Sequence, residues 1–255
     1  MSNKPRTIND SRLGQALFSR FTNRLVAAAG GRAHILNQAA YAEDADEGDV
    51  FEALLERVDD PELHKMVRIH QTDEKRHAEL FREALRRNGF EPYPVPRELS
   101  LLERLDAALG GFFESFTERE HPVMDAYILL QVIEERAVTQ FSQLRTAFAK
   151  YDPQTAELLD EISRDEARHL KYCVAISRRY APDEETRLQT LAEFRRHEAQ
   201  VFAELSRANM RHVLEAELPD MSRLELRIWR GILSLLSRAN RPVPTPYWDA
   251  EPAAA

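Results

Sequence analysis

Two stretches decide the fold: DPELHKMVRIHQTDEKRH, residues 60–77, and DPQTAELLDEISRDEARH, residues 152–169. Each opens with Asp-Pro, and each ends on a histidine that follows a glutamate by three positions. The proline stands thirteen residues before Glu74 in the first stretch and thirteen before Glu166 in the second. Proline is typical of the first turn of a helix. The shared layout therefore predicts two matching helices and indicates an internal duplication.

Proline and glycine divide the rest of the chain into helical segments. The pattern predicts two helical hairpins, 32–88 and 122–180, joined by a crossover, 89–121, that is long enough to span a bundle. The expected division is a lead-in with a short helix at 1–31, a four-helix bundle at 32–180 and a C-terminal extension at 181–255. The individual helices are expected at 32–58, 61–88, 98–119, 122–150, 153–180, 184–217 and 221–239.

Composition limits the class of protein. Only 8 of 255 residues are glycine, which favours helices, and 43% are hydrophobic, which allows a sizeable core. The net charge of −8 disfavours a nucleic-acid surface. A single cysteine excludes a disulfide framework within the chain, and no apolar run approaches the roughly 20 residues that cross a bilayer. The N-terminus lacks a signal peptide pattern, so we expect a cytoplasmic protein.

The two matched helices each carry a carboxylate and an imidazole on one face. Glu74 and His77, like Glu166 and His169, are three residues apart and so point the same way. Burying these groups unpaired is costly, and a pair of metal ions removes that cost. Such ligands suit iron and also manganese. The surrounding positions on these faces are apolar: Leu63, Val67, Phe81, Ala84, Leu159, Ile162, Cys173 and Ile176.

A metal pair needs further carboxylates from the other two helices. Glu134 is the single carboxylate on the apolar stripe of the segment 122–150. The segment 32–58 offers several, and we favour Glu43, with Glu47 as a second carboxylate and Asp44 in reserve.

Along the chain, the candidate ligands follow the order one acid, one Glu-x-x-His pair, a second acid and a second Glu-x-x-His pair. This order resembles that of the ferritin-like di-iron carboxylate superfamily. The superfamily includes ferritins, rubrerythrins, acyl-carrier-protein desaturases, arylamine N-oxygenases and a bacterial tRNA hydroxylase. DEKRH at residues 73–77 is similar to the desaturase motif, whereas IEERAVTQF at 133–141 and DEARHLKY at 165–172 are closer to the tRNA hydroxylase. The resemblance covers roughly 32–180. It implies an all-α, ferritin-like four-helix bundle with a long crossover between its second and third helices.

The resemblance also implies roles for single residues. Glu74, His77, Glu134, Glu166 and His169 would be metal ligands. Asp73 and Asp165 would orient a ligating imidazole on another helix. His70 stands four residues before Glu74 on the same face, and is either a third histidine ligand or an ordinary buried histidine.

Three functions follow as hypotheses. The first is a di-iron oxygenase or oxidase that uses dioxygen, or peroxide, on a small organic substrate, with an electron donor that the sequence does not identify. RNA as substrate stays open through the likeness to the tRNA hydroxylase. The second is a ferroxidase, an iron-storage protein or a rubrerythrin-like peroxidase. The third is a metal-free helical scaffold. A monomer or homodimer would favour the enzyme, and a large shell would favour storage.

Overall fold

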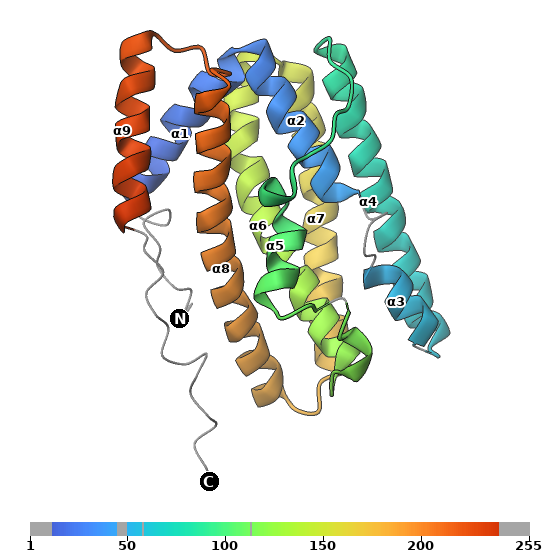
Figure 1. The fold of residues 1–255 in the computed structure, drawn as a ribbon. Helices are drawn as coiled ribbons and strands as arrows, with labels where there is room; N and C mark the ends of the chain where they lie inside the picture. The colour runs from blue at the N-terminus through green and yellow to red at the C-terminus, as the bar shows by residue number, and fades with distance from the viewer. Residues whose placement is uncertain (1–11, 45–49, 58, 113, 240–255) are drawn as a thin grey trace.

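The computed structural model describes residues 12–44, 50–57, 59–112 and 114–239 (Figure 1). Within these ranges the chain is all-helical, with nine α-helices, two short 3-10 helices and no strand, which confirms the expected class. The α-helices are α1 (Arg12–Ala27), α2 (Ala29–Glu43), α3 (Val50–Arg57), α4 (Pro61–Arg87), α5 (Leu101–Ala108), α6 (Pro122–Tyr151), α7 (Pro153–Arg179), α8 (Glu184–Glu215) and α9 (Arg223–Ala239). The 3-10 helices are Arg97–Leu99 and Phe116–Glu118.

The two Asp-Pro pairs start α4 and α7 by the same local device. Asp60 caps α4 by accepting hydrogen bonds from the backbone amides of Glu62 and Leu63. Asp152 caps α7 by accepting one from the amide of Thr155. A proline occupies the first turn in both helices, where its missing N–H costs nothing. The capped starts fix the register of everything thirteen residues downstream.

The same two aspartates tie the helices together at both ends. Asn88, at the end of α4, donates from Nδ2 to Asp152 Oδ2 at 2.9 Å. Arg179, at the end of α7, donates from Nη2 to Asp60 Oδ2 at 2.7 Å. Because each start is bonded to the other helix's end, α4 and α7 lie antiparallel with their middle turns level.

Two further helices, α2 and α6, pack beside this pair. α2 packs along α4, α6 packs along α7, and α4 contacts α7. In Figure 1, α2 and α7 descend whereas α4 and α6 ascend, and the segment that carries α5 runs back along the length of the helices. One apolar cluster includes a residue from each of the four: Leu36, Phe81, Phe141 and Leu159.

Three further helices, α1, α8 and α9, lie on one side of these four, whereas α3 packs on α4. α8 packs on α6, α9 packs on α8, and α1 contacts both α2 and α6. Phe21 of α1 meets Trp229 of α9 edge to face, with ring centroids 5.1 Å apart. None of the helices in the described ranges is long and apolar enough to cross a membrane.

The expectation of one helix over 32–58 is wrong. α2 ends at Glu43, Asp44 is extended with ψ 105°, and α3 begins at Val50. The sequence at this point is an acidic run, whose like charges three and four residues apart oppose helix continuation. The break before α2 also differs from expectation, because it falls at Ala28. Gly31 lies inside α2, where a Cβ would meet the Leu25 carbonyl oxygen at 1.9 Å.

Replacing Asp152 with alanine is expected to lower the free energy of unfolding by about 1–2 kcal/mol, the typical cost of losing an N-cap. The change also removes the bond from Asn88. Urea unfolding of the metal-free protein measures it. Asp160→Ala, on the same helix, is the control, because its partner Arg145 is half-exposed and such surface pairs contribute about 0–1 kcal/mol. Equal losses in the two variants would contradict the role given to the cap.

Candidate metal centre

Seven buried or half-buried side chains from four helices meet at the middle of α4 and α7. His77 and His169 are fully buried, and Glu166 is 1% exposed. The seven form two overlapping groups in which the candidate ligand atoms all lie within 4.8 Å of one another. The first group is His70, Glu74, Glu134 and His169, and the second is Glu43, Glu74, His77 and Glu166.

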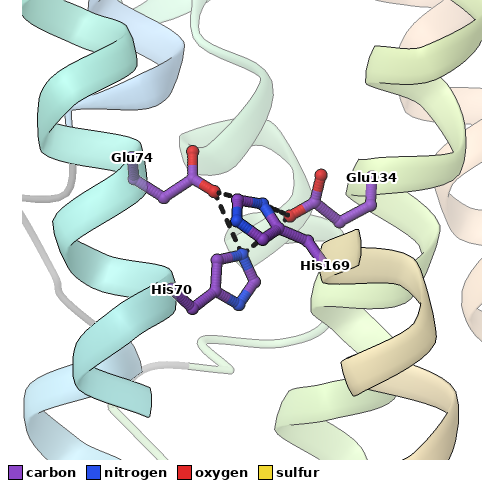
Figure 2. A group of neighbouring side chains, drawn as sticks. All are labelled: His70, Glu74, Glu134 and His169. Carbon is purple, nitrogen blue, oxygen red and sulfur yellow. Dashed lines mark hydrogen bonds and ion pairs between the residues drawn. The ribbon is translucent and has the colours of Figure 1, made fainter. Parts of the chain in front are cut away.

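Figure 2 shows the first group, with side chains from α4, α6 and α7 converging on one point. His70 Nε2 lies 2.8 Å from Glu134 Oε1 and 3.0 Å from Glu74 Oε1. His169 Nδ1 lies 3.1 Å from the same oxygen of Glu74 and 3.5 Å from Glu134 Oε1. Two imidazole nitrogens therefore face two carboxylate oxygens across a small space.

The second group repeats this arrangement around His77. His77 Nδ1 lies 3.2 Å from Glu166 Oε1, 3.3 Å from Glu43 Oε2 and 3.9 Å from Glu74 Oε2. Glu43 is the last residue of α2, so the end of that helix supplies the fourth carboxylate, beside Glu74, Glu134 and Glu166.

Glu74 and Glu166 lie between the two groups. Glu166 presents Oε1 to His77 Nδ1 and Oε2 to His169 Nδ1, each at 3.2 Å. Glu74 presents one oxygen to His169 and the other to His77. Each carboxylate thus reaches both groups, which is the position that a bridging ligand requires.

The outer nitrogens of the two imidazoles are held by aspartates from the opposite helix. His169 Nε2 lies 3.2 Å from Asp73 Oδ2, and His77 Nε2 lies 3.4 Å from Asp165 Oδ2. An ionised carboxylate only accepts, so each Nε2–H donates, and each Nδ1 points at the cluster, where it can bind a cation once its own proton is released. This contact is the one that the family resemblance implied for the two aspartates.

Two arginines complete the reciprocal arrangement. Arg168 donates from Nη2 to Asp73 Oδ2 at 2.7 Å, and Arg76 pairs with Asp165. The charges of Arg168 and Arg76, together with the hydrogen bond from His77, outweigh burial and lower the pKa of Asp165. The aspartate therefore stays ionised while it orients the ring.

The cluster retains protons when no metal is bound. Burial raises the pKa of Glu134 to about 8, and the charge of Glu166 adds to the effect. Burial opposes the charging of His77, but its hydrogen bonds to Glu166 and Glu43 outweigh that cost and raise its pKa to about 10. Burial alone would raise the pKa of Glu74, yet its close contacts with the imidazoles of His169 and His70 bring that pKa below its usual range.

The chemistry of this cluster fits a metal ion. Oε1 of Glu74 and Oε1 of Glu166 are buried, and the imidazole nitrogens 3.0–3.2 Å from them are not aligned for a hydrogen bond; no other described residue donates to them. A buried carboxylate oxygen without a donor is costly, and a cation is the partner that removes the cost of several at once. These buried histidines and glutamates can hold a metal ion, and their nitrogen and oxygen donors suit the borderline transition metals.

Of the residues proposed from the sequence, the structure brings six together: Glu43, Glu74, His77, Glu134, Glu166 and His169. Glu47 lies outside the described residues. Asp44 lies apart from both groups and pairs with Arg82.

The sequence left the role of His70 open, and the structure places His70 in the first group. The signal for it was its place one turn before Glu74 on an otherwise apolar face. The matching position in α7 is Ile162, so the duplication gave no support for a histidine there.

A cavity of about 340 Å³ with largely apolar walls reaches the cluster. Its lining includes Glu43, Glu74, Glu134, Glu166 and His70, whereas His77 and His169 are set back from it. α1, α2, α6 and α8 supply most of the remaining wall, with Leu236 from α9 and residues 99–102 from the crossover. A volume of this size lies in the range of small-molecule sites.

The metal-free protein is expected to lose stability as pH rises from about 6.5 to 10. The pKa of His77 is raised by folding, so the stability it contributes is full below its unfolded value of 6.5 and is lost through about 10. The raised pKa of Glu134 acts in the same direction up to about 8. Urea midpoints measured in chelator at pH 6, 8 and 10 test this.

The Glu134→Gln variant is the control for that measurement. Its neutral amide does not titrate, so the decrease of the unfolding free energy with pH should be smaller below pH 8, and the part that comes from His77 should remain. Unfolding free energies that stay level or rise over this interval would contradict the assignment.

Comparisons of the chain with protein-family models, with curated proteins and with solved structures found no match. The residues and their geometry therefore carry what is inferred about function.

Proposed function

We propose that this protein is a non-haem di-iron oxidoreductase that activates dioxygen to oxidise an organic substrate. One observation carries the proposal: a buried cluster of four carboxylates and three imidazoles opens on a cavity of about 340 Å³ with largely apolar walls. The proposal includes a ferritin-like four-helix bundle formed by α2, α4, α6 and α7, with the segment 89–121 as the crossover.

The charge of the cluster supports two divalent ions. Four ionised glutamates bring four negative charges, the neutral imidazoles bring none, and two divalent cations balance the total. One ion would be held by Glu134, His169 and His70, and the other by Glu43 and His77. Glu74 and Glu166 would bridge them, because each reaches both groups. Iron is proposed over manganese from the resemblance of the motifs.

The residues around the cluster have separate tasks. When bound, the iron pair would supply the electrons and the coordination positions that dioxygen activation requires. Asp73 and Asp165 hold the rings of His169 and His77 in the orientation that directs Nδ1 inward. The apolar wall on α6 and α8 keeps water from the cavity and binds an organic molecule beside the carboxylates.

The cavity favours an enzyme over an iron-handling protein. A ferroxidase needs a path for ions, which polar and acidic side chains provide. Here the described lining beyond the cluster is dominated by leucine, phenylalanine and other apolar side chains from α1, α6 and α8. A space with mostly apolar walls suits an organic substrate better than a hydrated cation.

Metal loading is the primary test. After anaerobic addition of ferrous iron, the protein is expected to hold two ions per chain and to consume dioxygen, measured by elemental analysis and an oxygen electrode. The Glu74→Ala, Glu166→Ala double variant should lose both ions and stay helical by circular dichroism. The control is Glu79→Ala, Glu161→Ala on the same two helices, where both side chains are half-exposed.

Two results would sink the proposal: a wild-type chain that binds no iron, or a Glu74, Glu166 double variant that still binds two ions. Many ions per chain within a large shell would identify an iron-storage protein instead. Rapid reduction of peroxide with little use of dioxygen would identify a peroxidase of the rubrerythrin type.

The aspartate behind each imidazole should affect metal affinity without touching the metal. Asp73→Asn keeps the shape but weakens the acceptor for His169 Nε2, and loss of such a partner typically lowers metal affinity about 10–100-fold. Competition with a coloured chelator measures the change. Asp160→Asn on the exposed face of α7 should leave the affinity at the wild-type value, and a Asp73→Asn affinity equal to this control would remove the orienting role.

A further inference from the structure

The cavity wall carries an arginine that forms no ion pair or hydrogen bond with the described part of the chain. Arg207 of α8 lies in the cavity wall. Its Nη1 is buried without a hydrogen-bond acceptor, and no ion pair engages the side chain among the described residues. Arg207 as a whole is half-buried. A guanidinium is always charged in proteins, so its buried Nη1 beside the apolar space is a ready donor to an anion.

The second arginine in the cavity wall, Arg136, is paired with an acid of the protein. Arg136 donates from Nε and Nη2 to the two oxygens of Glu198 at 2.6 and 2.9 Å. Its guanidinium also lies over the ring of Phe202, 3.9 Å from the centroid. Arg136 is therefore compensated within the protein, and Arg207 is not.

The acids near the cavity are already engaged. The four glutamates belong to the metal cluster, and Asp44 pairs with Arg82. Glu204, one turn before Arg207, lies 3.7 Å from Arg104. Burial lowers the pKa of Arg207, Glu204 opposes the shift, and the positive charges of Arg104 and Arg211 add to it. The surroundings thus disfavour the charge of Arg207 unless an anion arrives.

The distance between Arg207 and the cluster along the helix axes follows from the register of α6 and α8. α6 and α8 run in the same direction, and the Arg136–Glu198 pair marks level turns on the two helices. Arg207 is nine residues beyond Glu198, or about 13 Å along α8 at 1.5 Å per residue. Glu134 is about 3 Å before Arg136 on α6 by the same rise. Helical side chains lean toward the N-terminus, which brings the guanidinium to roughly 10 Å from the level of the cluster.

The wall between the two sites is mostly apolar along both helices, with Gln140 of α6 and Ser206 of α8 among its few polar side chains. A stripe of α8 and a stripe of α6 face this space, and neither carries a charge other than the ones already named. The apolar side chains in these stripes are Phe202, Leu205, Met210 and Val213 on α8, and Leu130, Ile133, Ala137, Phe141 and Leu144 on α6.

We propose that the substrate is an amphipathic monocarboxylic acid, whose carboxylate binds Arg207 and whose apolar body lies along the cavity with its far end at the metal cluster. This inference rests on the proposed function for the reaction, but not for the binding. One planar guanidinium matches one carboxylate with two parallel hydrogen bonds, whereas a phosphate dianion would bring a second, unmatched charge. With C–C bonds of about 1.5 Å, a straight chain of roughly eight to ten carbons spans the gap.

Calorimetric binding of decanoate to the full-length protein tests the inference, in both the iron-loaded and the metal-free state. Arg207→Gln should weaken decanoate binding about tenfold or more, the usual effect of losing a charge-assisted hydrogen bond. Arg207→Lys should weaken it less. Arg211→Gln, which removes a nearby exposed charge, should leave it unchanged. Binding of 1-decanol should be weak and insensitive to all three substitutions.

Decanoate binding that is equal in wild type and Arg207→Gln would overturn the inference, provided that both proteins unfold at the same temperature. Tighter binding of decyl phosphate than of decanoate would overturn the choice of a carboxylate. A protein that binds decanoate through Arg207 but no iron supports this inference while the proposed oxidoreductase fails. A protein that binds iron but not decanoate contradicts this inference and leaves the proposed oxidoreductase standing.

Discussion

Four glutamates within one buried cluster repel one another, and the arrangement of the central helices depends on how that charge is compensated. Without a metal, protons on histidine and on Glu134 supply part of the compensation. Burial and the charge of Glu166 raise the pKa of Glu134, and the carboxylates of Glu166 and Glu43 raise the pKa of His77 against the cost of burial. A bound cation compensates the charge more effectively than protons do, because it interacts with several carboxylate oxygens at once. The apolar residues above and below the cluster close it from water and make the compensation obligatory.

The two halves of the cluster support each other through reciprocal contacts. Each of α4 and α7 supplies a glutamate and a histidine inward, and an aspartate and an arginine that serve the other helix. The caps at the two helix starts bond to the opposite helix ends in the same reciprocal way. Rigid registration of α4 against α7 is what places four ligand side chains at one height.

The halves differ on the side that faces the cavity. His70 has Ile162 as its counterpart, and α2 ends at Glu43 where α6 continues far beyond Glu134. The early end of α2 and the addition of α8 leave space beside the carboxylates, and the histidines bonded to aspartates lie away from it. Symmetry thus builds the ligand cluster, and its loss on one side provides room for a ligand.

The sequence by itself determined the helices α4, α6 and α7, their starts at proline, and the paired Glu-x-x-His faces, because caps, proline and a 3.6-residue period act within a few residues. It also indicated Glu134 as the acid of α6. It did not determine where α2 ends, which of the acids at 43–47 faces the cluster, or that His70 belongs to it. Those outcomes depend on contacts between helices far apart in the chain, as does the lone charge of Arg207 in the cavity. Only the tertiary structure decides them, because a single helix face leaves open which neighbour will cover it.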